Sequence, residues 1–98
     1  LSKIESTFVN RVRGLSMYPE YLDGDLIIIR SDYEAQNGDD IVVSINASDY
    51  TLKRYDKKNS TLMALNPKYS ESVKIEENDE VVILGVVDTI IREKKKRY

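Results

Sequence analysis

Ser16 stands in the short stretch RGLSMYP, between a glycine and a proline, where a hydroxyl group could act as a nucleophile. A serine alcohol needs a neighbouring base that removes its proton. The chain has no histidine and no cysteine, so a Ser-His-Asp triad, a thiolate nucleophile and a histidine zinc site are excluded within it. Aspartate, glutamate, tyrosine and lysine remain as bases. Lowering the pKa of a lysine from about 10.4 to near neutrality takes about 4 kcal/mol, which burial can supply.

Lys53 differs from the other lysines, most of which lie in polar turns or in the terminal tail. It lies inside the run YTLKRY, whose alternation predicts a strand. In a strand, Thr51, Lys53 and Tyr55 share one face, and Leu52 and Arg54 share the other. No carboxylate lies within two residues of this lysine. Lys53 is therefore the candidate general base for a serine nucleophile.

Both residues also have a purely structural interpretation. Ser is a preferred residue at the start of a helix, so Ser16 could cap a helical turn formed by residues 17–21. Lys53 could be an outward-facing charge that protects the edge of a sheet. The capping role is compatible with catalysis, because the start of a helix offers backbone N–H groups that stabilise an oxyanion. The residues alone leave these alternatives open.

The elements that must position these side chains are predicted to be mostly short strands. Strands are expected near residues 6–14, 26–30, 40–45, 50–55, 61–65 and 80–91, with turn signals at 23–25, 36–39, 46–49, 56–60 and 66–70. The first should be half-buried, and Gly85 should mark a bulge or bend in the last. Residues 16–22 allow one short helical turn, with Pro19 in its first turn. We expect an all-β fold, a small and strongly bent barrel or sandwich with one short helical turn.

The composition fits one small domain. The chain has 98 residues, 41% of them hydrophobic and 33% charged, and its net charge of −2 gives no general attraction to nucleic acid. The single basic block, REKKKR at residues 92–97, is expected to be a solvated tail. No membrane span or signal peptide is visible, and the absence of cysteine fits a cytoplasmic protein. Because the chain begins at Leu1 without methionine, we expect it to be a piece or a processed product.

The ordered set of motifs resembles the self-cleaving domain of LexA-type repressors, UmuD-type mutagenesis proteins and many phage repressors. The resemblance runs from about Phe8 to Arg92 through FVNRVRGLSMYPEYLDGDLIIIR, NGDDIVVSI, YTLKRY, LMALNPKY and VVILGVVDTIIR. Its centre is the Gly-x-Ser-Met element, the following Asp-Gly-Asp and the Lys-Arg pair. The separation of Ser16 and Lys53 (53 − 16 = 37) agrees with the family spacing.

The resemblance implies a LexA-type Ser-Lys peptidase domain over residues 1–98, with Ser16 as the nucleophile and Lys53 as its general base. Backbone N–H groups of Leu15 and Ser16 would bind the oxyanion, and neither a cofactor nor a metal is implied. The family usually cleaves a bond between small residues, often Ala-Gly, in its own upstream hinge. The stretch ahead of Ser16 contains no such bond and no DNA-binding domain. We therefore expect the carboxy-terminal product, or a chain cut short of the scissile bond.

The resemblance also implies partners. A homodimer would form through the strand Val81–Ile91, whose alternative role is that of a central core strand. A RecA-like filament or a phage inducer would act as co-protease. DNA would be bound only through the missing amino-terminal domain, and no membrane is involved.

Three other functions remain open at this stage. They are an UmuD-type subunit of an error-prone polymerase, a catalytically silent dimerisation module and a relative of membrane signal peptidases. The absence of a membrane anchor and the Lys-Arg-Tyr context count against the last of them.

Overall fold

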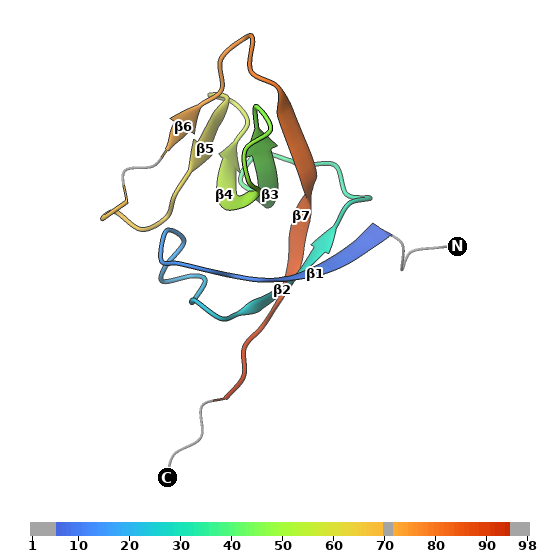
Figure 1. The fold of residues 1–98 in the computed structure, drawn as a ribbon, viewed down its shortest axis with the longest axis vertical. Coiled ribbons are helices and arrows are strands. Elements are labelled where there is room, and N and C mark those ends of the chain that lie inside the picture. The colour runs from blue at the N-terminus through green and yellow to red at the C-terminus, as the bar shows by residue number, and fades with distance from the viewer. Residues whose placement is uncertain (1–5, 70–71, 95–98) are drawn as a thin grey trace.

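The fold is a single antiparallel sheet of seven strands (Figure 1). The structure is a computed structural model and describes residues 6–69 and 72–94. The strand order across the sheet is β1-β2-β7-β3-β4-β5-β6. In chain order the strands are β1 (Thr7–Arg11), β2 (Leu26–Arg30), β3 (Asp40–Ile45), β4 (Thr51–Asp56), β5 (Thr61–Met63), β6 (Val73–Lys74) and β7 (Val81–Ile91). The all-β prediction is confirmed, although the sheet stays open and does not close into a barrel.

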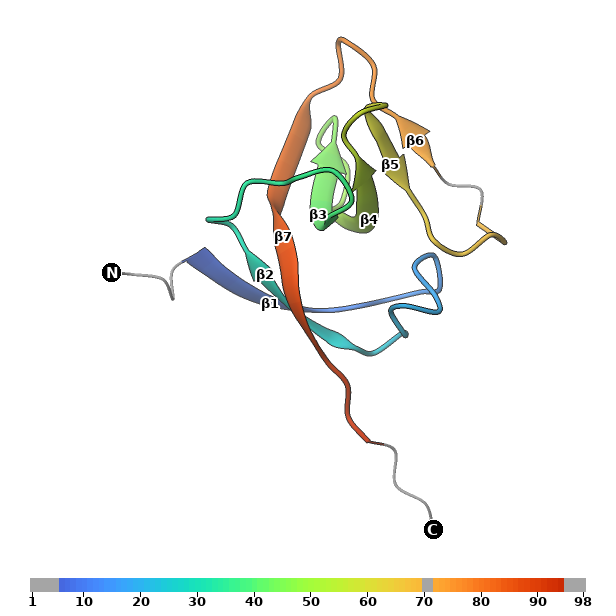
Figure 2. The same cartoon turned by 180° about the vertical axis from the view of Figure 1, so that it is seen from behind.

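The long strand β7 joins the two halves of the sheet (Figures 1 and 2). Its second half, residues 86–91, pairs with β2, and its first half, residues 81–86, pairs with β3. The register shifts between Ile28 and Ile29 on β2 and between Val42 and Val43 on β3. A bulge bends a strand and increases its twist, so β7 can serve both halves although they turn away from each other.

Gly85 lies beside the second irregularity, as its position in the sequence predicted. A Cβ atom at this residue would lie 2.7 Å from the carbonyl oxygen of Arg30 and 2.7 Å from Cγ2 of Ile29. The backbones of β7 and β2 therefore approach each other more closely at Gly85 than a side chain on this residue would allow.

Two apolar clusters stabilise the sheet. Both contain residues of β3, which is buried on both faces from Ile41 to Ser44. One cluster holds Val42 together with Val12, Met17, Tyr21, Ile27 and Ile29. The other holds Ile41, Val43, Leu62 and Val86. Val12, Met17 and Tyr21 belong to the segment around Ser16, so the first cluster fixes that segment to the sheet.

The structure corrects two expectations about the elements and confirms one. The first strand is more exposed than expected, because β1 is an edge strand: its last four residues are all exposed, with Phe8 at 39% and Val9 at 61% exposure. The expected helical turn is present as a single turn that does not continue into a helix: Tyr21 N–H donates to Met17 O, four residues earlier, and Tyr18 N–H donates to Leu15 O. The two-residue strand β6 was not predicted. Within the described residues, no helix has the length and apolar character that crossing a membrane requires.

Candidate active site

Ser16 lies in the connection between β1 and β2, residues 12–25, which we call the serine loop. Two backbone hydrogen bonds close its base, from Val12 N–H to Asp25 O (2.7 Å) and from Gly24 N–H to Val12 O (2.8 Å). Gly14 has a φ of 88°, which favours glycine, and its N–H donates to Asp23 Oδ1 at 2.7 Å. The loop therefore has a defined conformation on both sides of the serine, whose side chain is half-buried.

Lys53 lies in the interior of the sheet. Its strand β4 is flanked by β3 and β5, and Lys53 pairs across the ladder with the fully buried Ile41. Only 9% of Lys53 is exposed, and among the described residues no carboxylate forms an ion pair with its amine. The interpretation of Lys53 as an outward charge at a sheet edge is therefore wrong. A buried lysine without an anionic partner is unusual, because burial without a partner is costly for an ammonium group.

One cavity brings the two candidate residues together. It has a volume of about 610 Å³, and its lining includes Leu15, Ser16, Lys53, Tyr50 and Tyr69. Within the described part of the chain, no hydrogen bond joins the Ser16 hydroxyl to the Lys53 amine. Such contacts are often long before a substrate is bound. The arrangement places an alcohol, a buried amine and two aromatic side chains around a space that could hold a peptide segment.

The expected helix cap is wrong, because no helix begins at Ser16. A helix dipole therefore cannot supply the stabilisation of an oxyanion that the sequence suggested. The backbone around Ser16 is instead held by the connection between β5 and β6. Leu65 N–H and Asn66 N–H donate to Ser16 O at 3.0 Å and 2.9 Å, and the Asn66 side-chain amide donates to Leu15 O at 2.8 Å.

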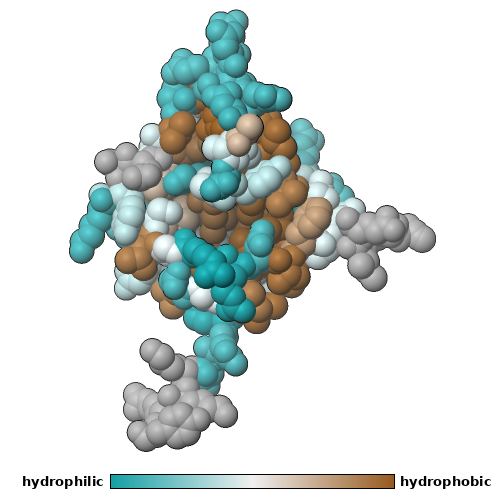
Figure 3. Space-filling view, viewed as in Figure 1, coloured by the Kyte–Doolittle hydropathy of each residue, from teal (hydrophilic) through white to brown (hydrophobic). Residues whose placement is uncertain are grey.

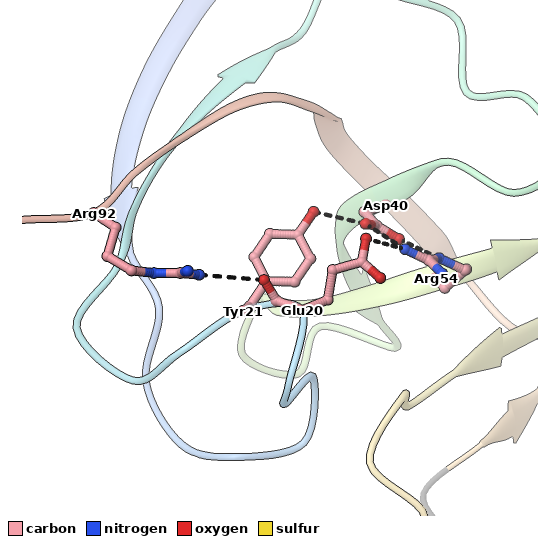
Figure 4. Close-up of polar contacts among 5 residues, drawn as sticks. All are labelled: Glu20, Tyr21, Asp40, Arg54 and Arg92. Atoms are coloured by element: carbon pink, nitrogen blue, oxygen red, sulfur yellow. Dashed lines mark hydrogen bonds and ion pairs between the residues drawn. The ribbon is translucent and has the colours of Figure 1, made fainter.

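A charged cluster ties the other side of the serine loop to the strand that carries Lys53 (Figure 4). Arg54 donates from Nε to Asp40 Oδ1 at 2.7 Å and from Nη2 to Glu20 Oε2 at 2.8 Å. The hydroxyl of the buried Tyr21 donates to Asp40 Oδ2 at 2.6 Å. Burial, followed by this hydrogen bond, raises the pKa of Tyr21, and the hydrogen bond to Asp40 raises the pKa of Arg54. The loop and β4 are thus joined through Tyr21 and Arg54, whose raised pKa values keep both side chains protonated near neutral pH.

Arg92 makes a third contact with the loop, so the first residue of the predicted solvated tail is not free. It donates from Nη2 to Asp25 Oδ2 at 2.7 Å and to the carbonyl oxygen of Glu20 at 3.3 Å. Asp25 is only 3% exposed and also accepts from Leu22 N–H at 2.8 Å. The hydrogen bond from Arg92 lowers the pKa of Asp25. Residues 95–97 of the tail lie outside the described residues.

Sequence reasoning missed Asn66, Tyr21 and the pair Asp40–Arg54 as residues that organise the site. The register of β3 and β4 explains why Asp40 and Arg54 interact, because the two residues are direct cross-strand neighbours. Opposite charges at facing positions of two predicted strands are a signal that the sequence offers once their register is known. No comparable local signal marks Asn66, which contacts residues about fifty positions earlier in the chain.

Comparison with known proteins gives a consistent picture. Residues 1–88 match the family described as Peptidase S24-like. The chain is 36% identical over 90 residues to LexA repressor 1 of Nocardia farcinica, which covers 89% of this chain and 39% of the relative. It is 39% identical over 88 residues to the LexA repressor of Cupriavidus metallidurans, covering 87% and 40%. It is also 37% identical over 98 residues to the prophage repressor CohE of Escherichia coli, covering 96% and 42%. The chain thus spans about two fifths of the length of these relatives.

Proposed function

This chain belongs to the Peptidase S24-like family, and we propose that it is the carboxy-terminal self-cleavage and dimerisation domain of a LexA-like or phage-type transcriptional repressor. The observation that carries this proposal is the cavity shared by Ser16 and the buried Lys53. The similar LexA and prophage repressors favour this role over an UmuD-type subunit. A silent dimerisation module would have no need for a buried lysine that lacks an anionic partner.

The proposed chemistry begins with the uncharged amine of Lys53, which takes the proton of the Ser16 hydroxyl. The Ser16 oxygen attacks a peptide carbonyl, and backbone N–H groups near Leu15 and Ser16 stabilise the oxyanion. Collapse of this intermediate breaks the C–N bond, and the lysine returns its proton to the leaving amine. Water then hydrolyses the acyl-enzyme, with the lysine again acting as base. Closure of a peptide over the cavity excludes water from the reacting groups.

The proposed substrate is a segment of the protein's own chain upstream of Leu1, cleaved between small residues. A RecA-like filament or a phage inducer would favour the conformation in which this segment occupies the cavity. DNA would be bound by an amino-terminal domain, which fits the two-fifths share of the repressor relatives that this chain spans. Cleavage would separate that domain from the dimerising half and so lower its affinity for paired half-sites.

The proposed dimer forms through β7. The large apolar residues on this strand with more than a third of their surface exposed are Val82, Ile83, Ile90 and Ile91. β7 lies inside the sheet, as the alternative of a central core strand expects. This position is compatible with a role of the same strand in the dimer. Residues 81–86 of β7 pair with β3 on one side of the strand, and residues 86–91 pair with β2 on the other side. The sheet therefore uses β7 in its centre and still leaves apolar side chains of the strand available to a second copy.

The decisive experiment places an Ala-Gly-containing peptide ahead of Leu1 through a flexible linker and follows the intact mass at several pH values. We expect cleavage at the added peptide, faster at alkaline pH because a lysine base acts only when neutral. Ser16→Ala and Lys53→Ala should each abolish it, while Lys58→Ala, which changes a turn lysine, should leave the rate unchanged. A fluorophosphonate probe should label Ser16. Cleavage that continues in Ser16→Ala, or the absence of both cleavage and labelling in the unsubstituted chain, would contradict the proposal.

A further inference from the structure

Asn66 is a buried polar residue that contacts the backbone on both sides of the Ser16 α-carbon. Only 8% of Asn66 is exposed. Its side-chain amide donates to Leu15 O at 2.8 Å, and its backbone N–H donates to Ser16 O at 2.9 Å. The side-chain oxygen accepts from Lys68 N–H at 3.0 Å. Because that oxygen already has an N–H donor, the NH₂ group must be the end that faces Leu15. Both ends of the amide are therefore fixed.

The anchored carbonyls decide where the neighbouring N–H groups point. A trans peptide places its C=O and N–H on opposite sides. Among the described residues, the bond between Tyr18 and Pro19 is the one cis peptide, so the bonds on both sides of Ser16 are trans. Because Leu15 O and Ser16 O both point toward Asn66, the N–H groups of Ser16 and Met17 point away from it.

The cavity lies beside this stretch of backbone. Ser16 and Met17 line the cavity, whereas Leu65 and Asn66 do not. Within the described part of the chain, neither Ser16 N–H nor Met17 N–H donates a hydrogen bond to a protein acceptor. Two adjacent donors without a protein acceptor thus belong to residues that line the cavity.

We infer that Asn66 is a positioning residue, which holds the backbone from Leu15 to Met17 so that the N–H groups of Ser16 and Met17 take part in the oxyanion pocket. This inference rests on the proposed peptidase function and adds the N–H of Met17 to the donors expected from the sequence. Asn66 itself touches neither the substrate nor the reacting atoms. Its effect is geometric, because donors aimed at an oxyanion stabilise the transition state only when their direction is fixed beforehand.

The test compares Asn66→Ala and Asn66→Asp with Asn37→Ala in the linked-peptide protein described above. Aspartate keeps the shape and the acceptor for Lys68 N–H, but its carboxylate cannot donate to Leu15 O. Asn37 is a matched control, since its side-chain oxygen accepts from the backbone of Lys57 at 2.7 Å at a turn that does not line the cavity. We expect both Asn66 variants to cleave between about tenfold and about a hundredfold more slowly, and the control within twofold of the parent.

Three further readouts separate positioning from loss of structure. Affinity for a peptide boronic acid, which forms a tetrahedral adduct with the serine, should fall with the cleavage rate. Affinity for the uncleaved peptide, measured in a Ser16→Ala background, should change less than twofold, and the pH midpoint of cleavage should not move. In the unsubstituted protein, boronate binding should shift the amide NMR signals of Ser16 and Met17. That measurement stands even if the Asn66 variants fold poorly.

The outcomes distinguish the two proposals. If Ser16→Ala abolishes cleavage but Asn66→Ala cleaves within twofold of the parent, the positioning role is wrong and the peptidase stands. Equal losses of boronate affinity and peptide affinity, or unshifted Ser16 and Met17 amide signals, also overturn the positioning role. If Ser16→Ala cleaves as fast as the parent, the peptidase assignment itself is wrong.

Discussion

At the scale of single residues, Lys53 is where stability and the proposed function conflict. A buried ammonium loses its hydration, and no carboxylate among the described residues compensates that loss by an ion pair. Such a residue lowers the stability of the fold, so its presence calls for another requirement that it meets. A general base that must be uncharged when the substrate is bound supplies that requirement.

Replacing Lys53 by methionine should therefore separate stability from cleavage. The apolar side chain fills similar space without a charge, so we expect the free energy of unfolding to rise by about 1 kcal/mol. Cleavage of the linked peptide should fall by at least about a hundredfold, because the base is removed. Urea unfolding and intact-mass kinetics measure the two effects. Lys58→Met, at an exposed turn, should change neither, and a less stable Lys53→Met would refute this account.

The pair Asp25–Arg92 should make the free energy of unfolding depend on pH in the acidic range. The hydrogen bond from Arg92 lowers the pKa of Asp25 in the folded protein relative to the unfolded chain. A group of this kind contributes stability above its unfolded pKa of about 3.8, and the contribution is lost as the pH falls through the lower folded value. The charged form of Asp25 thus favours folding at neutral pH.

Asp25→Asn should consequently lower the urea midpoint at pH 7, and the gap to the parent should close as the pH falls well below 4. Asn keeps the shape of the residue but pairs less strongly with Arg92. Unfolding curves at a series of pH values provide the measurement. Asp23→Asn is the neighbouring control for a loop carboxylate that does not pair with Arg92. A gap that stays constant down to pH 2 would show that charge at Asp25 is not its cause.

At the scale of elements, the serine loop is the least regular segment of the site, yet it is held in place by several contacts. It has no helix or strand of its own, yet three parts of the chain hold it: the connection after β5 through Asn66, strand β4 through Arg54 and the end of β7 through Arg92. Met17 and Tyr21 add buried contacts from within the loop. A loop fixed in this way can present its backbone N–H groups in one direction without a helix dipole.

Strand β7 must pass very close to β2 for the two halves of the sheet to share it. Gly85→Ala would place a Cβ atom 2.7 Å from Arg30 O, and backbone has little freedom to move aside. We expect a loss of about 1–3 kcal/mol in the free energy of unfolding, measured by urea denaturation. Val82→Ala, at a position on the same strand that is 46% exposed, should cost much less. An equal loss in both variants would mean that the close approach is not limiting.

At the scale of the whole molecule, the sheet leaves many large apolar side chains exposed. Figure 3 shows hydrophobic residues in the middle of one face, interrupted there by hydrophilic residues, and further hydrophilic residues at its upper end. Val82, Ile83, Ile90 and Ile91 on β7 add to the exposed apolar residues. Exposed apolar patches mark interaction sites, which agrees with the proposed dimer.

Ile90→Glu should shift the proposed dimer toward monomer. A charge at this 38% exposed residue would be desolvated in a two-fold interface and placed near its own copy, so we expect the dimer dissociation constant to rise at least about tenfold. Sedimentation velocity across a concentration series measures it. Val73→Glu introduces the same charge on β6, at the far end of the sheet, and should leave the dimer intact. Equal weakening by both variants would contradict an interface on β7.

The sequence by itself determined where most strands lie and which residue types could act as the base. Short apolar runs that follow turn signals predicted β2 and β3 with their observed bounds, and the absence of histidine and cysteine reduced the choice of a base to a few residue types. These features are local, and a strand or an inventory of side chains follows from neighbours in the chain. Gly85 likewise indicated a bend before its partners were known.

Only the tertiary structure decided that Lys53 is buried, that β1 is an exposed edge and that the turn after Ser16 is not a helix. Burial depends on which strands lie on each side, and β4 lies between β3 and β5 only once the order of the sheet is set. The contacts of Asn66 and Arg92 with the serine loop join residues about fifty and about seventy positions apart. No local pattern encodes such contacts, because they arise from packing of the complete chain.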